Sequence, residues 1–181
     1  MTSMKIALLL AVFVVAVTMA APAQTQVFVP GNASGYFGNT ADQLVPLVPA
    51  ISVTGPGTIT VTYVSGTVDI GGVEVGPNGI TQHNCPQAPL QEAQGAAGGT
   101  CNHVGGLVGV FVPQARVDHS GFNAIDGTKD AAKVGVMPGR LFFIGEGKTL
   151  DVKQAGTLFL GINDEHVSDN TEGFNVEVTG P

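Results

Sequence analysis

The chain has 181 residues, with 7 basic and 14 acidic residues, a formal net charge of −7, 26 glycines and 11 prolines. This length suits one domain, and the acidic balance disfavours nucleic acid or an anionic membrane surface as a partner, because phosphate binding needs clustered Lys and Arg. Cations and neutral ligands are favoured instead.

The first residues indicate an export signal. Lys5 precedes an uncharged run from Ile6 to Met19, and Ala21-Pro22-Ala23 provides a small-residue cleavage site. We expect a signal peptide over residues 1–23, cleavage after Ala23, and a secreted or periplasmic mature chain of residues 24–181. The apolar run is shorter than the roughly 20 residues that a membrane-spanning helix needs, so we expect no membrane span.

Short strands separated by Gly and Pro turns are expected along the mature chain. Thr58 to Val64 alternates apolar residues with threonine, the period of a half-buried strand, whereas Leu107 to Val112 is a nearly continuous apolar run, typical of a buried strand. About eight or nine such strands and no long helical period predict an all-β fold, an antiparallel two-sheet β-sandwich. The expected strands lie at 27–30, 51–53, 58–64, 66–70, 107–112, 134–137, 140–145, 158–162 and 174–178.

Two cysteines bracket a stretch rich in Gln, Ala and Gly that we interpret as a long loop, Pro86 to Thr100. An exported protein with two cysteines favours one disulfide, Cys85 to Cys101. Closing such a loop contributes about 3 kcal/mol in the chain-entropy model. The alternative is a Cys2His2 zinc site with the nearby His83 and His103, although the spacing is not a familiar one for zinc.

No constellation indicates an enzyme. Asp118, His119 and Ser120 are the three residue types of a hydrolase triad, but adjacent residues cannot form the relay, which needs groups that converge in space. The sequence also lacks a G-x-S-x-G nucleophile elbow. We therefore expect a binding or structural protein.

An oxygen-rich loop between the last two expected strands carries the main chemical signal. It combines carboxylates, an amide and a hydroxyl without any Lys or Arg, namely Asp164, Glu165, Ser168, Asp169, Asn170 and Glu172. Such a set suits a hard cation with six to eight oxygen ligands, which points to Ca²⁺. The alternative is an ordinary solvated turn, since Asp and Asn are common turn residues, and the spacing is not that of an EF-hand.

The motifs on both sides of this loop resemble a known family. G-T-L-F-L-G-I-N-D at 156–164, followed by D-N-x-x-G-F-x-V-x-V at 169–178, resembles the C-terminal signature of the PA-I-like calcium-dependent galactophilic lectins of bacteria. The resemblance implies a jelly roll of the galactose-binding-like type. It also implies side-chain ligands for Ca²⁺ from Asp164, Asp169 and Asn170, with backbone carbonyls near His166 and Ile70.

A second stretch extends the resemblance to the sugar. Gly76 to His83 has the spacing of the lectins' G-P-x-G-x-x-x-H run, with Gln87 shortly after it. By resemblance, His83 and Gln87 contact a galactose-type sugar. Vicinal hydroxyls of that sugar complete the calcium coordination, so Asp164 and Asn170 also count as sugar-binding.

We therefore expect an exported calcium-dependent carbohydrate-binding module with a glycan partner, and self-association is left open. The alternative is an exported structural or interaction module with a structural Ca²⁺ ion or none, and no glycan ligand. An open coordination position beside His83 and Gln87 distinguishes the two.

Overall fold

The computed structural model describes residues 23–33, 47–83, 100–114, 141–164 and 166–181. The expected signal peptide, except for Ala23, and the expected strand at 134–137 lie outside these ranges, as do Cys85 and Gln87. In the described part of the chain, no helix is long and apolar enough to cross a membrane.

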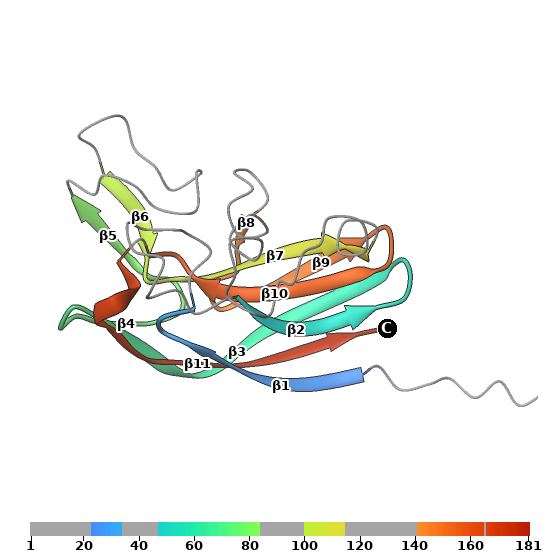
Figure 1. The fold of residues 1–181 in the computed structure, drawn as a ribbon, viewed down its shortest axis with the longest axis horizontal. Coiled ribbons are helices and arrows are strands. Elements are labelled where there is room, and N and C mark those ends of the chain that lie inside the picture. Colours follow the sequence, from blue (N-terminus) through green and yellow to red (C-terminus); the bar gives the residue numbers. More distant parts are fainter. Residues whose placement is uncertain (1–22, 34–46, 84–99, 115–140, 165) are drawn as a thin grey trace, which may run out of the picture.

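Two antiparallel sheets form the body of the protein (Figure 1). The larger sheet has five strands: β1 (Ala23–Pro30), β3 (Gly57–Ile70), β4 (Glu74–Val75), β9 (Gly147–Val152) and β11 (Asn170–Gly180). Four of them are paired in the order β1-β11-β3-β4, and β9 pairs with the first half of β3. The smaller sheet has the order β2-β10-β7-β8; its members are β2 (Val48–Val53), β7 (Leu107–Pro113), β8 (Leu141–Phe143) and β10 (Gly156–Ile162). The predicted all-β, antiparallel sandwich is confirmed.

Two smaller elements complete the described structure. A separate hairpin pairs β5 (Ile80–His83) with β6 (Thr100–Val104). A short 3-10 helix, η3 (Val167–Asp169), lies between β10 and β11. The hairpin strands flank the stretch that we expected to be a long loop.

The main core lies between the two sheets and follows from the alternation in the sequence. Alternate residues face inward in the first half of β3, in β11 from Phe174 onward and in β10; the buried set includes Ile59, Val61, Phe174, Val176, Val178, Leu158, Leu160 and Ile162. Phe174 is fully buried, and the ring of Tyr63 meets it edge-on with 5.9 Å between centroids. Burying one such side chain contributes about 1.5–3 kcal/mol.

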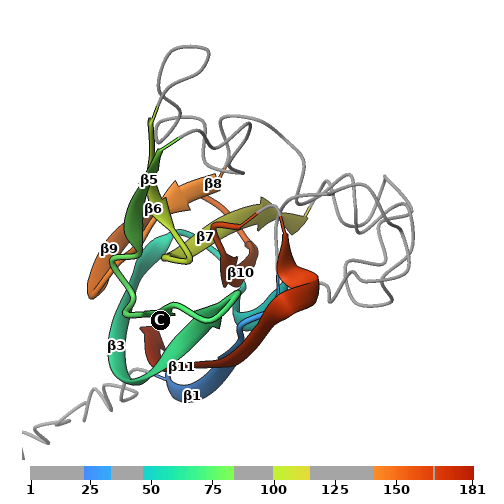
Figure 2. The same ribbon diagram turned by 90° about the vertical axis from the view of Figure 1, so that its left-hand side faces the viewer.

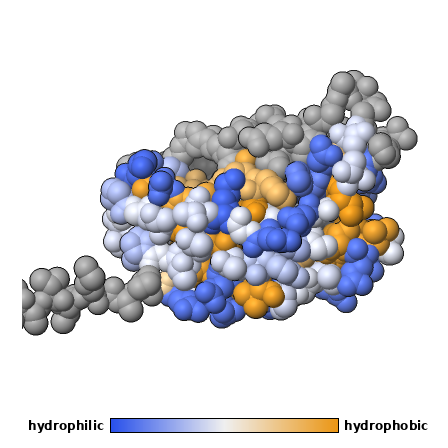
Figure 3. All heavy atoms as spheres, turned by 180° about the vertical axis from the view of Figure 1, so that it is seen from behind, coloured by the Kyte–Doolittle hydropathy of each residue, from blue (hydrophilic) through white to orange (hydrophobic). Residues whose placement is uncertain are grey.

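Strand β7 is buried on both faces. Leu107 belongs to the core between the sheets, whereas Val108, Val110 and Val112 pack with Phe159 in a second apolar cluster. A strand covered on both sides needs apolar residues without alternation. The expectation of a buried strand from the continuous apolar run is therefore confirmed. On the face seen in Figure 3, hydrophilic residues are mixed with smaller apolar areas.

Candidate functional site

The loop between β10 and β11, here called the acidic loop (residues 163–170), lies at one end of the sandwich. Its last residue, Asn170, begins β11 and pairs with Ile70 at the end of β3. Ile70 packs in turn against Cys101 and Val104 of β6. Figure 1 places β4, the start of β11 and the β5–β6 hairpin at its left-hand end, and Figure 2 shows that end face-on.

Asn163 fixes the start of the acidic loop. Its side chain is fully buried, and its Nδ2 donates to the carbonyl of His103 at 2.9 Å. Its backbone N–H donates to the Gly106 carbonyl at 2.9 Å, and its own carbonyl accepts from the N–H of Gly105 at 3.0 Å. The turn between β6 and β7 therefore holds the loop where it leaves β10. Sequence reasoning assigned Asn163 no role, although a polar residue directly after a buried apolar run is a local signal for such an anchor.

Asp164 places a carboxylate just inside the protein surface. Its side chain is only 7% exposed, and its Oδ1 accepts a hydrogen bond from the His166 backbone N–H at 3.1 Å. A carboxylate at this depth needs hydrogen bonds, a positive charge or a metal to offset its lost hydration. The His166 side chain is exposed, and only its backbone takes part in this turn.

Asn170 carries the most informative atom of the site. Its side chain is 6% exposed, and its Nδ2 donates to the Gly31 carbonyl at 2.9 Å. Its Oδ1 is buried and has no hydrogen-bond partner among the described residues. An unsatisfied buried acceptor costs about 1–3 kcal/mol, so such an atom indicates a site for a cation or a water molecule.

Asp169 reaches the same region from η3. Its Oδ2 lies 2.8 Å from the position that a Cβ would take on Gly71, in the turn between β3 and β4. Gly71 and Gly72 both have positive φ, at 61° and 91°, and the Ile70 N–H donates to the Val73 carbonyl at 2.9 Å across this turn. Glycine at position 71 thus leaves room for the carboxylate of Asp169. The structure places Ile70, Asp169 and Asn170 close to one another, and their role as calcium ligands stays a prediction.

The oxygen donors of this site fit a hard cation. The acidic loop supplies two carboxylates, from Asp164 and Asp169, the amide oxygen of Asn170, which has no partner among the described residues, and backbone carbonyls, which are the ligand types that Ca²⁺ takes. Within the described ranges, no group of three or more His, Cys, Asp or Glu side chains could hold a metal. The predicted calcium set does not depend on such a group, because only Asp164 and Asp169 contribute carboxylates to it.

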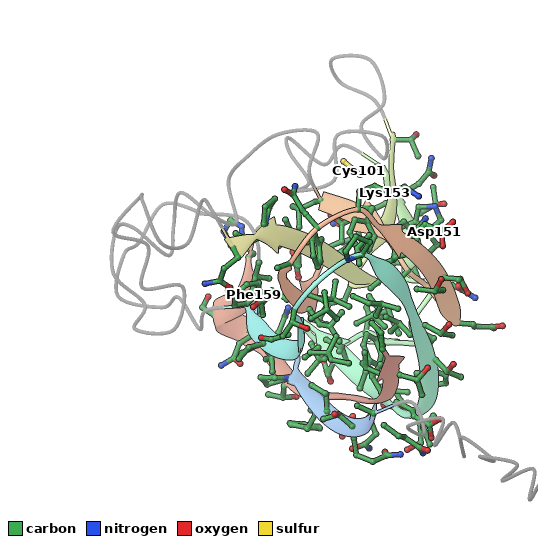
Figure 4. All side chains as sticks on the ribbon, turned by 90° about the vertical axis from the view of Figure 1, so that its right-hand side faces the viewer. Cys101, Asp151, Lys153 and Phe159 are labelled. Atoms are coloured by element: carbon green, nitrogen blue, oxygen red, sulfur yellow. The ribbon has the colours of Figure 1, made fainter. Side chains whose placement is uncertain are left out.

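The lysines that the structure describes lie outside the acidic loop. The two lysines in the described part of the chain are Lys148, on β9, and Lys153, directly after it. Lys148 Nζ lies 5.7 Å from the centroid of the Phe142 ring, and Lys153 lies with Asp151 at the end of the sandwich seen in Figure 4, opposite to the acidic loop. Neither of these two lysines belongs to the acidic loop.

The predicted sugar contacts are described only in part. His83 ends β5 and pairs with Thr100, but its side chain lies outside the described residues, as does Gln87. Both roles therefore stay predictions.

The state of Cys101 bears on the choice between the predicted disulfide and the alternative zinc site. Cys101 is 2% exposed, and the described part of the chain has no free cysteine. This disfavours a zinc site, which needs free thiolates. The Nδ1–H of His103 donates to the Asn78 carbonyl at 2.9 Å, and the His103 ring stacks on Phe143 with 3.8 Å between ring centroids. The pairing of Cys101 with Cys85 stays a prediction, because Cys85 lies outside the described ranges.

Comparison with protein-family models finds no match, and comparison with curated proteins finds none either. The site itself and the motifs in the sequence are therefore what indicate a function.

Proposed function

We propose that the protein is an exported calcium-dependent carbohydrate-binding module with a galactose-type ligand. The observation that carries this proposal is the buried Oδ1 of Asn170, which has no partner among the described residues and lies on a residue that the lectin motif assigns to calcium. A jelly roll of the galactose-binding-like type is part of the same proposal.

Each residue of the site has a defined role in this proposal. Asp164, Asp169 and the Oδ1 of Asn170 hold the ion, together with backbone carbonyls near His166 and Ile70. When bound, the ion supplies coordination positions for vicinal sugar hydroxyls. Extracellular modules typically bind Ca²⁺ with dissociation constants on the order of 10⁻⁴ to 10⁻³ M, so the site would be filled outside the cell.

The chain's own side chains give the sugar its orientation. His83 and Gln87 follow the β3–β4 region in sequence and would hydrogen-bond to hydroxyls of the sugar beside the ion. The β5–β6 hairpin carries His83 to the same end of the sandwich as the acidic loop, since Ile70 packs on β6. This arrangement supports a shared ion and sugar site.

Calcium titration followed by a glycan array tests the proposal. Isothermal titration should show one calcium site per chain. Binding to galactose-terminated glycans should then require calcium and disappear in EDTA. Calcium binding without any bound glycan would instead support the structural-ion alternative, and the absence of calcium binding would contradict the proposal.

A further inference from the structure

The turn after β1 contacts both ends of the acidic loop. At the start of the loop, the Ala33 carbonyl accepts a hydrogen bond from the N–H of Ile162 at 2.6 Å. At its end, the Gly31 carbonyl accepts from Nδ2 of Asn170 at 2.9 Å, and the Gly31 N–H donates to the Glu172 carbonyl at 2.8 Å. Ile162 and Asn170 belong to different sheets, so this turn joins the two sheets beside the candidate site.

The turn has little room to move. Ala33 is fully buried. A Cβ on Gly31 would lie 2.6 Å from the Thr171 carbonyl oxygen, and a Cβ on Gly161 would lie 2.6 Å from the Ala33 carbonyl oxygen. The backbone of the turn thus packs directly on the strands that flank the acidic loop, and a shift in one would displace the other.

The Gly31 carbonyl also decides which way the Asn170 amide points. A carbonyl oxygen can only accept hydrogen bonds, so the NH₂ group of Asn170 must face it, and the Oδ1 must face the other way. The Asn170 Oδ1 is the atom left without a partner among the described residues. The hydrogen bond to Gly31 therefore leaves an oxygen, and not an NH₂ group, on the side of the amide that has no partner among the described residues.

We propose that the turn formed by Gly31 and Ala33 is the positioning segment of the calcium site, with the Gly31 carbonyl orienting Asn170 towards the ion. This inference rests on the proposed calcium site. Because coupling between two equilibria is reciprocal, an ion that needs the oriented amide must also stabilise the turn against opening.

Hydrogen exchange of the full chain, with calcium and with EDTA, measures this coupling. Amides that open only when the ion leaves should exchange up to about 100-fold more slowly at calcium concentrations about 100 times the dissociation constant. We expect this slowing at the amides of Gly31 and Ala33 as well as in the acidic loop. Both amides are hydrogen-bonded, to Glu172 and to Pro30 respectively, so their exchange reports on opening of the turn.

The variant Asn170→Asp removes the donor to Gly31 but keeps oxygen ligands for a cation. Isothermal titration gives the calcium affinity of this variant, and at calcium concentrations that saturate it the ion should no longer slow exchange at Gly31 and Ala33. Asn175→Asp is the matched control, because Asn175 lies on the same strand, is exposed, and its side-chain amide donates to Ser65 Oγ. This control should keep the wild-type response at both amides.

The outcomes separate the two proposals. Wild-type protein that binds no calcium would overturn the calcium site and this inference together. Calcium binding with slowed exchange confined to the acidic loop, or with the same slowing in Asn170→Asp as in the wild type, would overturn the inference and leave the proposed function standing.

Discussion

Asp164 is the carboxylate on which the proposed site depends most. The side chain is 7% exposed and begins the acidic loop. We predict that Asp164→Ala abolishes the stabilisation by calcium, which for one site at 100 times its dissociation constant amounts to about 2.7 kcal/mol. Denaturant titration in calcium and in EDTA measures this difference.

Asp151→Ala is the control for this prediction. Asp151 is an exposed carboxylate on β9 that accepts a hydrogen bond from Thr58 Oγ1 at 3.1 Å, and it lies at the other end of the sandwich. Removing this carboxylate should leave the stabilisation by calcium unchanged. If calcium stabilises Asp164→Ala as much as it stabilises the wild type, the acidic loop is not the calcium site.

His83 tests the sugar half of the site. If it donates one hydrogen bond to the sugar and does not bind the ion, His83→Ala should weaken galactose binding by about 0.5–1.5 kcal/mol, roughly two- to tenfold. Calcium affinity should stay the same. Glycan binding and calcium titration on the same preparation measure both values, and a parallel loss of the two would mean that His83 supports the structure only.

The turn between β3 and β4 contains two adjacent glycines that allow a controlled comparison. Gly71 and Gly72 both have positive φ, so an alanine at either position costs about 1–2 kcal/mol. A Cβ on Gly71 would lie 2.8 Å from Asp169 Oδ2, whereas a Cβ on Gly72 would have nothing within 4 Å. We predict similar stability losses in EDTA for Gly71→Ala and Gly72→Ala, but a lower calcium affinity only for Gly71→Ala.

Calorimetric titration of both variants checks this prediction. If calcium binds equally well to Gly71→Ala and Gly72→Ala, the Asp169 carboxylate does not belong to the site. Asp169 would then be an ordinary exposed residue of η3.

The strands differed in how well the sequence predicted them. The alternation in β3 and the apolar run in β7 are local patterns, and both strands were predicted. Strand β9 was missed because Leu150 and Val152 are its only core-facing apolar residues, while Lys148, Thr149 and Asp151 are exposed. Strands β5 and β6 were also missed, because short polar strands beside a Gln- and Gly-rich stretch resemble a loop.

The candidate site also has features that the sequence predicts and features that it does not. The composition of the acidic loop is a local feature, so its carboxylates and Asn170 could be named from the sequence as candidate ligands, and their role as ligands stays a prediction. The hydrogen bonds that hold the loop in place could not be predicted, because Asn170 contacts Gly31 across 139 positions of the chain and Asn163 contacts His103 across 60. Contacts at such separations depend on the pairing of strands, which leaves no signature in either segment.

At the scale of the whole molecule, the sandwich is held together by the core between its sheets. Phe174 is fully buried there and lies on β11, the strand that pairs with both β1 and β3. We predict that Phe174→Ala lowers the free energy of unfolding by about 3–5 kcal/mol, because it removes a large buried ring and leaves a cavity. Urea unfolding measures the change, and a loss below about 1 kcal/mol would contradict this packing.

A thermal melt of the mature chain in EDTA, in calcium, and in calcium with galactose tests the central claim most directly. One calcium site at 100 times its dissociation constant should raise the melting temperature by about 5–10 °C for a chain of this size. Galactose should raise it further, but only when calcium is present. A melting temperature that calcium leaves unchanged would contradict the account.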